Sequence, residues 1–203
     1  MKKKIVFLYL VPWLLFSIIN VTLAKNNSTY IFEQTSASFY VFLVALQAIG
    51  VCFGAIIAGF VADLFGRRIA LAITLSLYGT SAALGGIFAN PQVFSVMYFI
   101  NGMSWGILFV MYIFVVWGDL ANKDNCSKMY SLGVLTYFLS LGLGAFIPQI
   151  FLPFGTSSLL ICLIIFLSIL PIFLSPELVR SDFIERIRLK RHINALSKNK
   201  NQG

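Results

Sequence analysis

The chain has 203 residues, of which 59% are hydrophobic and only 11% are charged, and its mean hydropathy is +0.90. A soluble domain carries about 25% charged residues, so this composition excludes an ordinary soluble globule. The formal net charge is +8.

Four stretches lack Asp, Glu, Lys and Arg, and together they are long enough for six transmembrane helices. A transmembrane helix needs about 20 apolar residues, and a charge at mid-membrane costs about 2.5–3.5 kcal/mol. Asn90-Pro91 breaks the third stretch and Pro153 breaks the fourth, because proline lacks a backbone donor and biases its predecessor away from helix. The fold class is therefore all-α and polytopic. The predicted spans are 5–24, 39–61, 69–88, 92–118, 130–151 and 157–174.

The distribution of Lys and Arg predicts the orientation. With the N-terminus inside, every Lys and Arg except Lys25 lies on the cytoplasmic side, as the positive-inside rule requires. We therefore expect a multi-pass protein of the cell membrane, surrounded by the lipid bilayer, with both termini in the cytoplasm. Residues 1–175 would form the membrane domain and 176–203 a basic cytoplasmic tail. The rule accounts for the net charge, so nucleic acid is not an expected partner.

The basic tail is predicted to begin with a helix. Ser175-Pro176 is typical of an N-cap followed by proline at the first helical position. Leu189, Ile193 and Leu196 recur at helical spacing among basic residues, which is typical of a helix lying on an anionic membrane surface. A solvated basic tail is the alternative. The last six residues are expected to be disordered.

The N-terminus also allows a second interpretation. Three lysines, an apolar run and a small-residue end at Ala24 fit a cleavable signal peptide. The apolar run is long for a signal peptide and contains Pro12 and Trp13. Cleavage would also leave an odd number of spans and put the two ends on opposite sides. We expect residues 1–24 to be retained as the first span.

Little in the sequence favours an enzyme. Cys52, Cys126 and Cys162 are far apart and form no CxxC pair, and His192 is the single histidine. No nucleophile with a base, no phosphate-binding loop and no pair of carboxylates is visible. We expect no catalytic residues, no cofactor and no metal site.

The most informative segment lies between the second and third spans. It holds Gly59, Asp63, Gly66 and the pair Arg67-Arg68. Gly59 would let a neighbouring helix come close, and Gly66 permits a positive φ. Asp63 can accept hydrogen bonds from backbone donors at a helix start. A short inside loop would explain the arginines but not the spacing of the glycines and the aspartate.

That spacing resembles the signature loop of the major facilitator superfamily, G-x-x-x-D-x-x-G-R-R/K. Asp119, with Lys128 nine residues later, is similar to that family's acidic-then-basic loop between its fourth and fifth helices. Pro176-Glu177 is similar to the pattern that ends a half of these proteins. The resemblance covers about 5–180. It implies a six-helix half built from two inverted three-helix repeats.

The departures from the pattern are informative as well. Leu64 stands where the family's first-half loop has a basic residue. The fourth helix of a typical first half has an Arg four residues before a Gly, but in this chain Tyr98 precedes Gly102 at that distance. These features and the basic tail make the chain more similar to the C-terminal half. The resemblance implies a half-size transporter that moves an unknown small solute by alternating access, as a dimer or with a second half. The chain begins with Met and ends in a polar tail, so we expect a whole product. The alternative is a non-transporting membrane subunit or a truncated product.

In such a half, the first, second, fourth and fifth spans would line the cavity, and the third and sixth would be outer supports. Unpaired amides in lipid are costly, so Gln47 and Asn101 should face protein or water. Hydrogen bonding between helices is an equally good interpretation of these two residues. Gly50 and Gly54 form a GxxxG packing face. The candidate cavity residues are Asn20, Gln47, Asn101, Tyr137, Ser140 and Gln149.

No predicted span contains a charged residue or histidine. Coupling to protons commonly uses such a buried group, so proton coupling from this chain alone is disfavoured, and so is a cationic substrate. We also predict a gate of cytoplasmic ion pairs that closes in one conformation and opens in the other. The signature-loop and gating residues are Gly59, Asp63, Gly66, Arg67, Arg68, Asp119 and Lys128.

Overall fold

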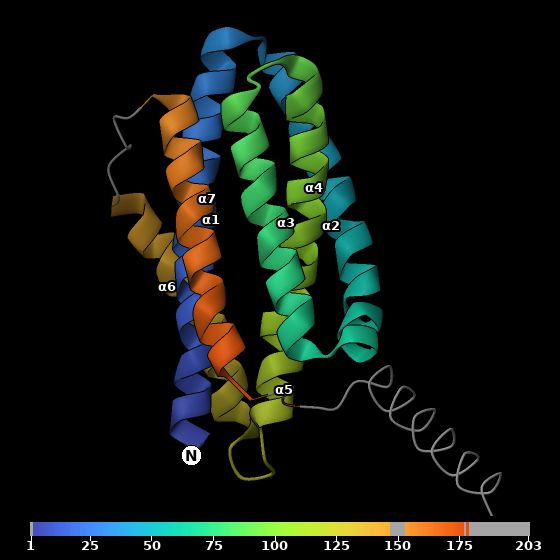
Figure 1. Ribbon diagram of the computed structural model, residues 1–203, viewed down its shortest axis with the longest axis vertical. Helices are drawn as coiled ribbons and strands as arrows, with labels where there is room; N and C mark the ends of the chain where they lie inside the picture. Colours follow the sequence, from blue (N-terminus) through green and yellow to red (C-terminus); the bar gives the residue numbers. More distant parts are fainter. Residues whose placement is uncertain (1, 147–152, 177, 179–203) are drawn as a thin grey trace, which may run out of the picture.

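The computed structural model describes residues 2–146, 153–176 and 178. Within these residues the chain is a bundle of long helices without strands (Figure 1), so the all-α prediction is confirmed. The fourth span is one continuous rod made of α4, a π-helical turn η1 and α5. The elements are α1 (Lys2–Gln34), α2 (Ala37–Phe65), α3 (Arg67–Ile87), α4 (Pro91–Val110), η1 (Met111–Val115), α5 (Val116–Leu120), α6 (Cys126–Phe146) and α7 (Phe154–Leu174).

Most of the predicted spans match these helices, and the largest difference is the length of the first helix. Five helical segments, α1, α2, α3, the α4–α5 rod and α7, are long and apolar enough to cross a membrane. The sixth, α6, is described only as far as Phe146. The first helix continues ten residues past the predicted end at residue 24, because the polar segment that follows remains helical up to Gln34.

The helix ends follow from identifiable capping residues. Ser36 accepts a hydrogen bond from the Phe39 amide at the start of α2, at 3.3 Å. Asn90 accepts from the Val93 amide at 3.0 Å and precedes Pro91 at the first position of α4. Gly66 separates α2 from α3 with φ of 86°, a left-handed conformation that glycine adopts without strain.

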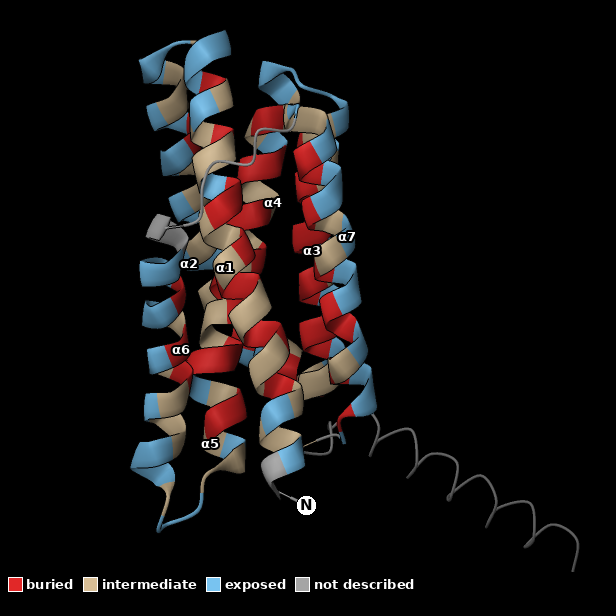
Figure 2. Cartoon of the chain, turned by 90° about the vertical axis from the view of Figure 1, so that its left-hand side faces the viewer, coloured by how far each residue is buried: buried red, intermediate tan, exposed pale blue. Residues whose placement is uncertain are grey.

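The helices pack as two inverted repeats. The most extensive contacts join α2 to α4 and α3 to α7, followed by those of α3 with α4, α1 with α7 and α1 with α6. Exchanging α1, α2 and α3 with α4, α6 and α7 leaves this set of contacts unchanged. In Figure 1, α6 and α2 lie on the two flanks of the bundle. Figure 2 shows α3 and α7 together on one side, opposite α2 and α6.

Close contact between α2 and α4 depends on glycines in both helices. A Cβ atom on Gly50 would lie 2.5 Å from the carbonyl oxygen of Phe99, and one on Gly54 would overlap the backbone of Met103. A Cβ atom on Gly102 would overlap the backbone of Gln47. The backbones of α2 and α4 therefore touch at these glycines, because small residues let membrane helices approach closely. The predicted packing role of Gly50 and Gly54 is confirmed.

The expected close contact at Gly59 is wrong in this structure. Gly59 is exposed, and a Cβ atom there would have no heavy atom within 4 Å. The closest approach of α2 to its neighbour occurs earlier in the helix, where the other glycines face α4. Gly59 lies near the end of α2, on a side that α4 does not cover.

An aromatic cluster joins α1, η1 and α6 within the core. The indole of Trp13 stacks on Tyr112 with ring centroids 4.7 Å apart, and its Nε1 donates to the Gly133 carbonyl at 2.9 Å. Trp13 and Tyr112 are fully buried. The π-helical turn shifts the register of the rod at Tyr112, as such turns often do near functional sites. The segment that signal-peptide cleavage would remove thus supplies part of this core.

Candidate functional site

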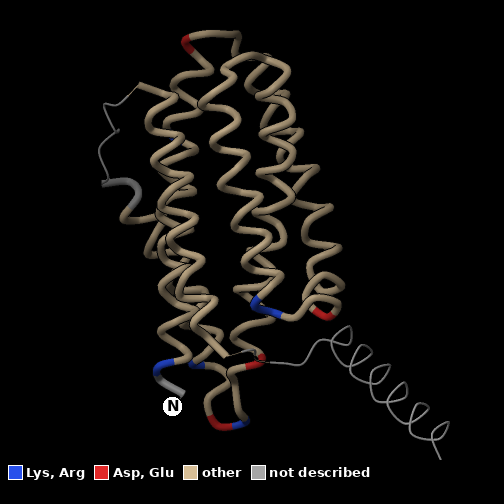
Figure 3. Tube along the Cα trace, viewed as in Figure 1, with Lys and Arg blue, Asp and Glu red and all other residues tan. Residues whose placement is uncertain are grey.

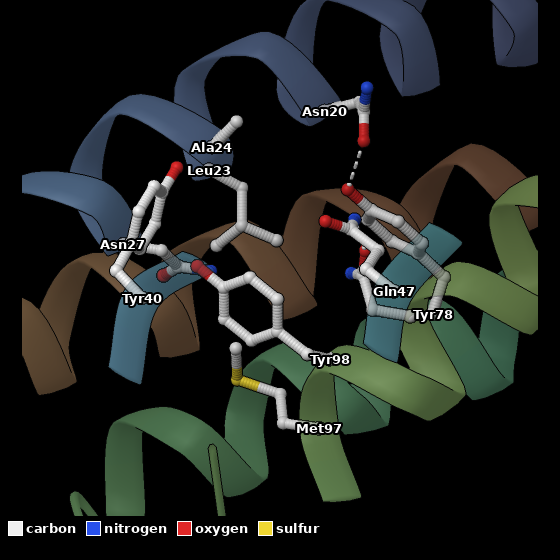
Figure 4. Close-up of a pocket in the computed structure, with 10 residues that line it drawn as sticks. Asn20, Leu23, Ala24, Asn27, Tyr40, Gln47, Tyr78, Met97 and Tyr98 are labelled. Carbon is white, nitrogen blue, oxygen red and sulfur yellow. Dashed lines mark hydrogen bonds between the residues drawn. The ribbon is translucent and has the colours of Figure 1, made fainter. Parts of the chain in front are cut away.

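A small polar pocket of about 40 Å³ lies between α1, α2, α3 and α4, in the part of the bundle away from Arg67 (Figure 4). The pocket is partly open. Amide and phenol groups dominate its polar surface, and none of the lining residues is charged. They are Asn20, Leu23, Ala24, Asn27, Tyr40, Gln47, Tyr78, Met97, Tyr98 and Asn101.

Hydrogen bonds between helices hold one end of this pocket. The Tyr78 hydroxyl on α3 donates to Asn20 Oδ1 on α1 at 2.7 Å, as Figure 4 shows. Gln47 Nε2 on α2 donates to Asn101 Oδ1 on α4 at 3.0 Å. The contact between Gly102 and the Gln47 backbone brings these two amides together. Gln47 and Asn101 therefore bond to each other between helices, as one of the two interpretations predicted. They also line the pocket, and contact with a substrate stays a prediction.

The other end of the pocket contains a polar atom without a partner. Asn27 is 5% exposed, and its Oδ1 has no hydrogen-bond partner within the part of the chain that the structure describes. In Figure 4 the side chains of Asn27, Tyr40 and Tyr98 gather at this end. A buried acceptor without a partner costs about 1–3 kcal/mol. Such a site favours the entry of water or of a ligand with a donor group.

Three of the six predicted cavity residues, Asn20, Gln47 and Asn101, line this pocket. Tyr137 belongs instead to the aromatic cluster, where it lies 6.1 Å from Trp13 between ring centroids. Ser140 is buried on α6 and donates to the Tyr137 carbonyl at 2.6 Å. The structure does not bring these two residues into the pocket.

Gln149, the sixth candidate, lies outside the described residues. So does the tail helix predicted after Pro176, of which only residue 178 is described.

Several lining residues were not among the predictions. Tyr78 was missed because its helix, the third, was expected to be an outer support. Asn27 was missed because the first span was predicted to end before it. The sequence did contain an indication of Asn27. It follows Asn20 by seven residues, and this spacing places both side chains on one face of a helix. The same spacing relates Tyr40 to Gln47.

Most described charged residues gather at one end of the bundle (Figure 3), which we call the basic end. Arg67 and Arg68 begin α3, and Lys123 and Lys128 lie where the chain turns from α5 into α6. Arg67 is the centre of an ion-pair corner, made of Asp63, Arg67 and Asp119. Its Nη1 lies 2.7 Å from Asp63 Oδ1, and its Nε lies 2.8 Å from Asp119 Oδ2.

The ion-pair corner joins three helices. Arg67 Nη1 also donates to the Ala62 carbonyl at 3.0 Å in the last turn of α2. Asp119 belongs to α5, so the guanidinium connects α2, α3 and the end of the fourth span. Asp63 accepts from the Arg67 side chain rather than from a helix start, because it lies in the last turn of α2. The prediction of backbone donors for Asp63 is wrong in this structure.

Two predicted gating residues lie away from this corner. Arg68 Nη1 donates to the carbonyls of Phe173 at 3.4 Å and Ser175 at 3.2 Å. A cation at a helix C-terminus is favourable, so Arg68 stabilises the end of α7. Lys128 is exposed on α6 and forms no ion pair with the described acidic residues.

Within the described residues no group of three or more His, Cys, Asp or Glu side chains could hold a metal ion. The buried polar groups are amides, hydroxyls and phenols, distributed over apolar helices. The family model of the Major Facilitator Superfamily matches residues 5–200.

The chain belongs to the major facilitator superfamily. The human organic anion transporter MFSD10 (TETRAN) is a solved structure with a similar fold, at 18% sequence identity and a TM-score of 0.56. The similarity covers 88% of this chain and 49% of that one, so the chain spans about half the length of that transporter. A search of curated proteins gave no significant match. The superfamily assignment and the apolar helices make this a multi-pass membrane protein of a transporter family.

Proposed function

We propose that this chain is one half of a membrane transporter that moves a small solute by alternating access. The single observation that carries the proposal is the uncharged polar pocket inside apolar helices. Buried amides and phenols are costly in a membrane unless they bond to one another or to a ligand. The lining of this pocket combines both situations, since Gln47 and Asn101 are paired whereas Asn27 Oδ1 has no described partner.

A second six-helix half would complete the translocation pathway. Superfamily transporters combine two such halves around a central cavity, and MFSD10 is about twice as long as the matched region. Large apolar side chains are exposed on α2 and α6, which lie on the two flanks of the bundle in Figure 1. These faces suit either lipid or a second half, and we propose a second copy of the chain or a separate half-size chain.

We further propose that the basic end faces the cytoplasm, in the cell membrane, with both termini inside. The ion-pair corner would then act as the inner gate. Its three residues lie on three helices, so a rearrangement of α5 relative to α2 and α3 would break the pair between Arg67 and Asp119. The six-helix domain would be 1–175, and the tail, 176–203, would lie on the anionic inner leaflet.

The test begins with native mass spectrometry of the protein in nanodiscs. We expect a dimer, or a complex with a second six-span chain. The same preparation in proteoliposomes should then take up a solute in a saturable manner, and Gln47→Leu should reduce this uptake. A strictly monomeric protein that takes up no solute would contradict the proposal, and a non-transporting subunit or truncated product would replace it.

A further inference from the structure

We propose that the groove between α3 and α7 binds one anionic phospholipid, with an acyl chain along the groove and the phosphate beside Arg68. This site is separate from the polar pocket, and the inference does not depend on whether the chain transports a solute. Three features carry it: an apolar groove that extends through about one leaflet, hydroxyl groups that are already bonded within α3, and a guanidinium at one end of the groove.

The groove is apolar and open to the outside of the bundle. Its volume is about 510 Å³, within the range of about 300–1,000 Å³ for small-molecule sites. It lies between two neighbouring helices on the side opposite α2 and α6 (Figure 2). Ala72 and Ile169, each 6% exposed, form its floor. Its walls are exposed apolar side chains, namely Ile73, Leu77, Phe166, Leu170 and Phe173.

The two hydroxyl groups in the lining are bonded within their own helix. Ser76 Oγ donates to the Ala72 carbonyl at 2.9 Å, and Thr80 Oγ1 donates to the Leu77 carbonyl at 3.0 Å. A polar ligand in the groove would lose its hydrogen bonds to water and gain no donor from these two groups. A hydrocarbon chain has no such bonds to lose, so it is the occupant that matches this surface.

The position and length of the groove fit one leaflet of a bilayer. Arg68, at the start of α3, donates from Nη1 to the Ser175 carbonyl just after α7 at 3.2 Å, so the two helices run in opposite directions from the basic end. From Arg68 to Thr80 the helix rises about 18 Å at 1.5 Å per residue. One leaflet of the hydrocarbon core is about 15 Å thick. A lipid with its headgroup at the basic end would therefore place its acyl chain along the groove.

The charge at this end of the groove selects the headgroup. Arg68 Nη1 also donates to the carbonyl of Phe173, whose side chain lines the groove, at 3.4 Å. A guanidinium presents a planar fork of N–H donors that matches the oxygens of a phosphate. The segment that follows, 176–203, contains seven Lys and Arg against three Asp and Glu. Positive charge near the membrane surface favours an anionic headgroup over a zwitterionic one.

The experiment measures lipid binding to the full chain by native mass spectrometry in detergent. The probes are phosphatidylglycerol and phosphatidylcholine with identical acyl chains, and inorganic phosphate is the competitor. We expect one phosphatidylglycerol to remain bound per chain, with an affinity about fivefold higher than that of phosphatidylcholine. Excess inorganic phosphate should not displace it. Equal affinities for the two lipids, or displacement by inorganic phosphate, would overturn the inference.

A variant that fills the groove locates the acyl chain. Ser76→Trp places an indole in the groove and should weaken the binding of both lipids by about fivefold or more. Ser131→Trp is the matched control, because Ser131 is an exposed serine on α6 that does not line the groove. Unchanged binding in Ser76→Trp, or an equal loss in Ser131→Trp, would overturn the assignment.

A second variant locates the headgroup. Arg68→Gln should lower the affinity for phosphatidylglycerol to that for phosphatidylcholine and leave the latter unchanged, which a general loss of stability would not produce. Lys123→Gln is the matched control, because Lys123 is an exposed cation between α5 and α6. A preference for phosphatidylglycerol that survives in Arg68→Gln, or is lost equally in Lys123→Gln, would refute the role of Arg68.

If Arg68→Gln does not fold, photolabelling of the unmodified chain provides an independent test. Phosphatidylglycerol with a diazirine in its acyl chain, bound at one molecule per chain, should label residues 72–80 of α3 or 166–173 of α7. Labels confined to other helices would overturn the inference. Selective lipid binding without solute uptake in proteoliposomes would contradict transport alone, and uptake without selective lipid binding would contradict this inference alone.

Discussion

The polar pocket and the ion-pair corner both connect helices of the bundle to one another, but they do so by different chemistry. In the pocket, neutral amides and phenols connect α1 to α3 and α2 to α4. In the corner, Arg67 connects α2, α3 and α5 through two carboxylates. The difference follows from the surroundings, since an ion in the membrane interior loses hydration that no other group restores. Neutral groups can change partners at small cost, whereas separating Arg67 from its two carboxylates costs more because charged groups are left without their partners.

The largest effect is expected where the pocket depends on helix packing. Gly102→Leu would push a side chain into the backbone of Gln47, which no rotamer can avoid, and should destabilise the protein by more than about 3 kcal/mol. Gly59→Leu introduces the same side chain where no atom lies within 4 Å. Thermal unfolding in detergent should show a large loss for Gly102→Leu and almost none for Gly59→Leu. Equal losses would mean that the contact between α2 and α4 does not support the pocket.

The second-largest loss of stability is expected in the ion-pair corner. Arg67→Gln removes both ion pairs and leaves Asp119, whose side chain is 20% exposed, without its cation. We expect a loss of about 2 kcal/mol that becomes smaller at high salt, because screening weakens the interactions of the wild-type protein.

Asp63→Asn is the matched comparison for the corner. The Asp63 side chain is 66% exposed, so the loss should be only about 0–1 kcal/mol. Chemical unfolding of both variants at low and high ionic strength measures these differences. A larger loss for Asp63→Asn than for Arg67→Gln would contradict the central position of Arg67.

The smallest effect should occur in the pocket. Tyr78→Phe removes the hydroxyl that donates to Asn20, and hydrogen bonds between membrane helices contribute about 0.6 kcal/mol on average. This loss should be independent of salt, in contrast to Arg67→Gln. The same unfolding series measures it, with Tyr30→Phe as the control on α1. A salt-dependent loss would show that charge reaches the pocket.

Some features were predictable because they depend on local sequence. Uncharged runs must lie in the membrane, so the positions of the helices followed from composition. The break at Asn90-Pro91 followed from capping and the missing donor of proline, and the positive φ of Gly66 followed from its place in a tight turn. The pair Gln47–Asn101 was expected to face protein or water because an unpaired amide in lipid is costly.

Other features depended on how the helices approach one another. The sequence contained Asn27 and Tyr78, but the first helix had to continue past its apolar run, and α3 had to turn Tyr78 toward Asn20, before they could share a cavity. Arg68 and Lys128 were predicted to join the same gate, yet in the structure Arg68 donates to the end of α7 and Lys128 is exposed on α6. Composition determines which segments enter the membrane, because hydration energy acts on each residue separately. Only the tertiary structure determines which polar groups meet, because a hydrogen bond requires two groups within about 3 Å.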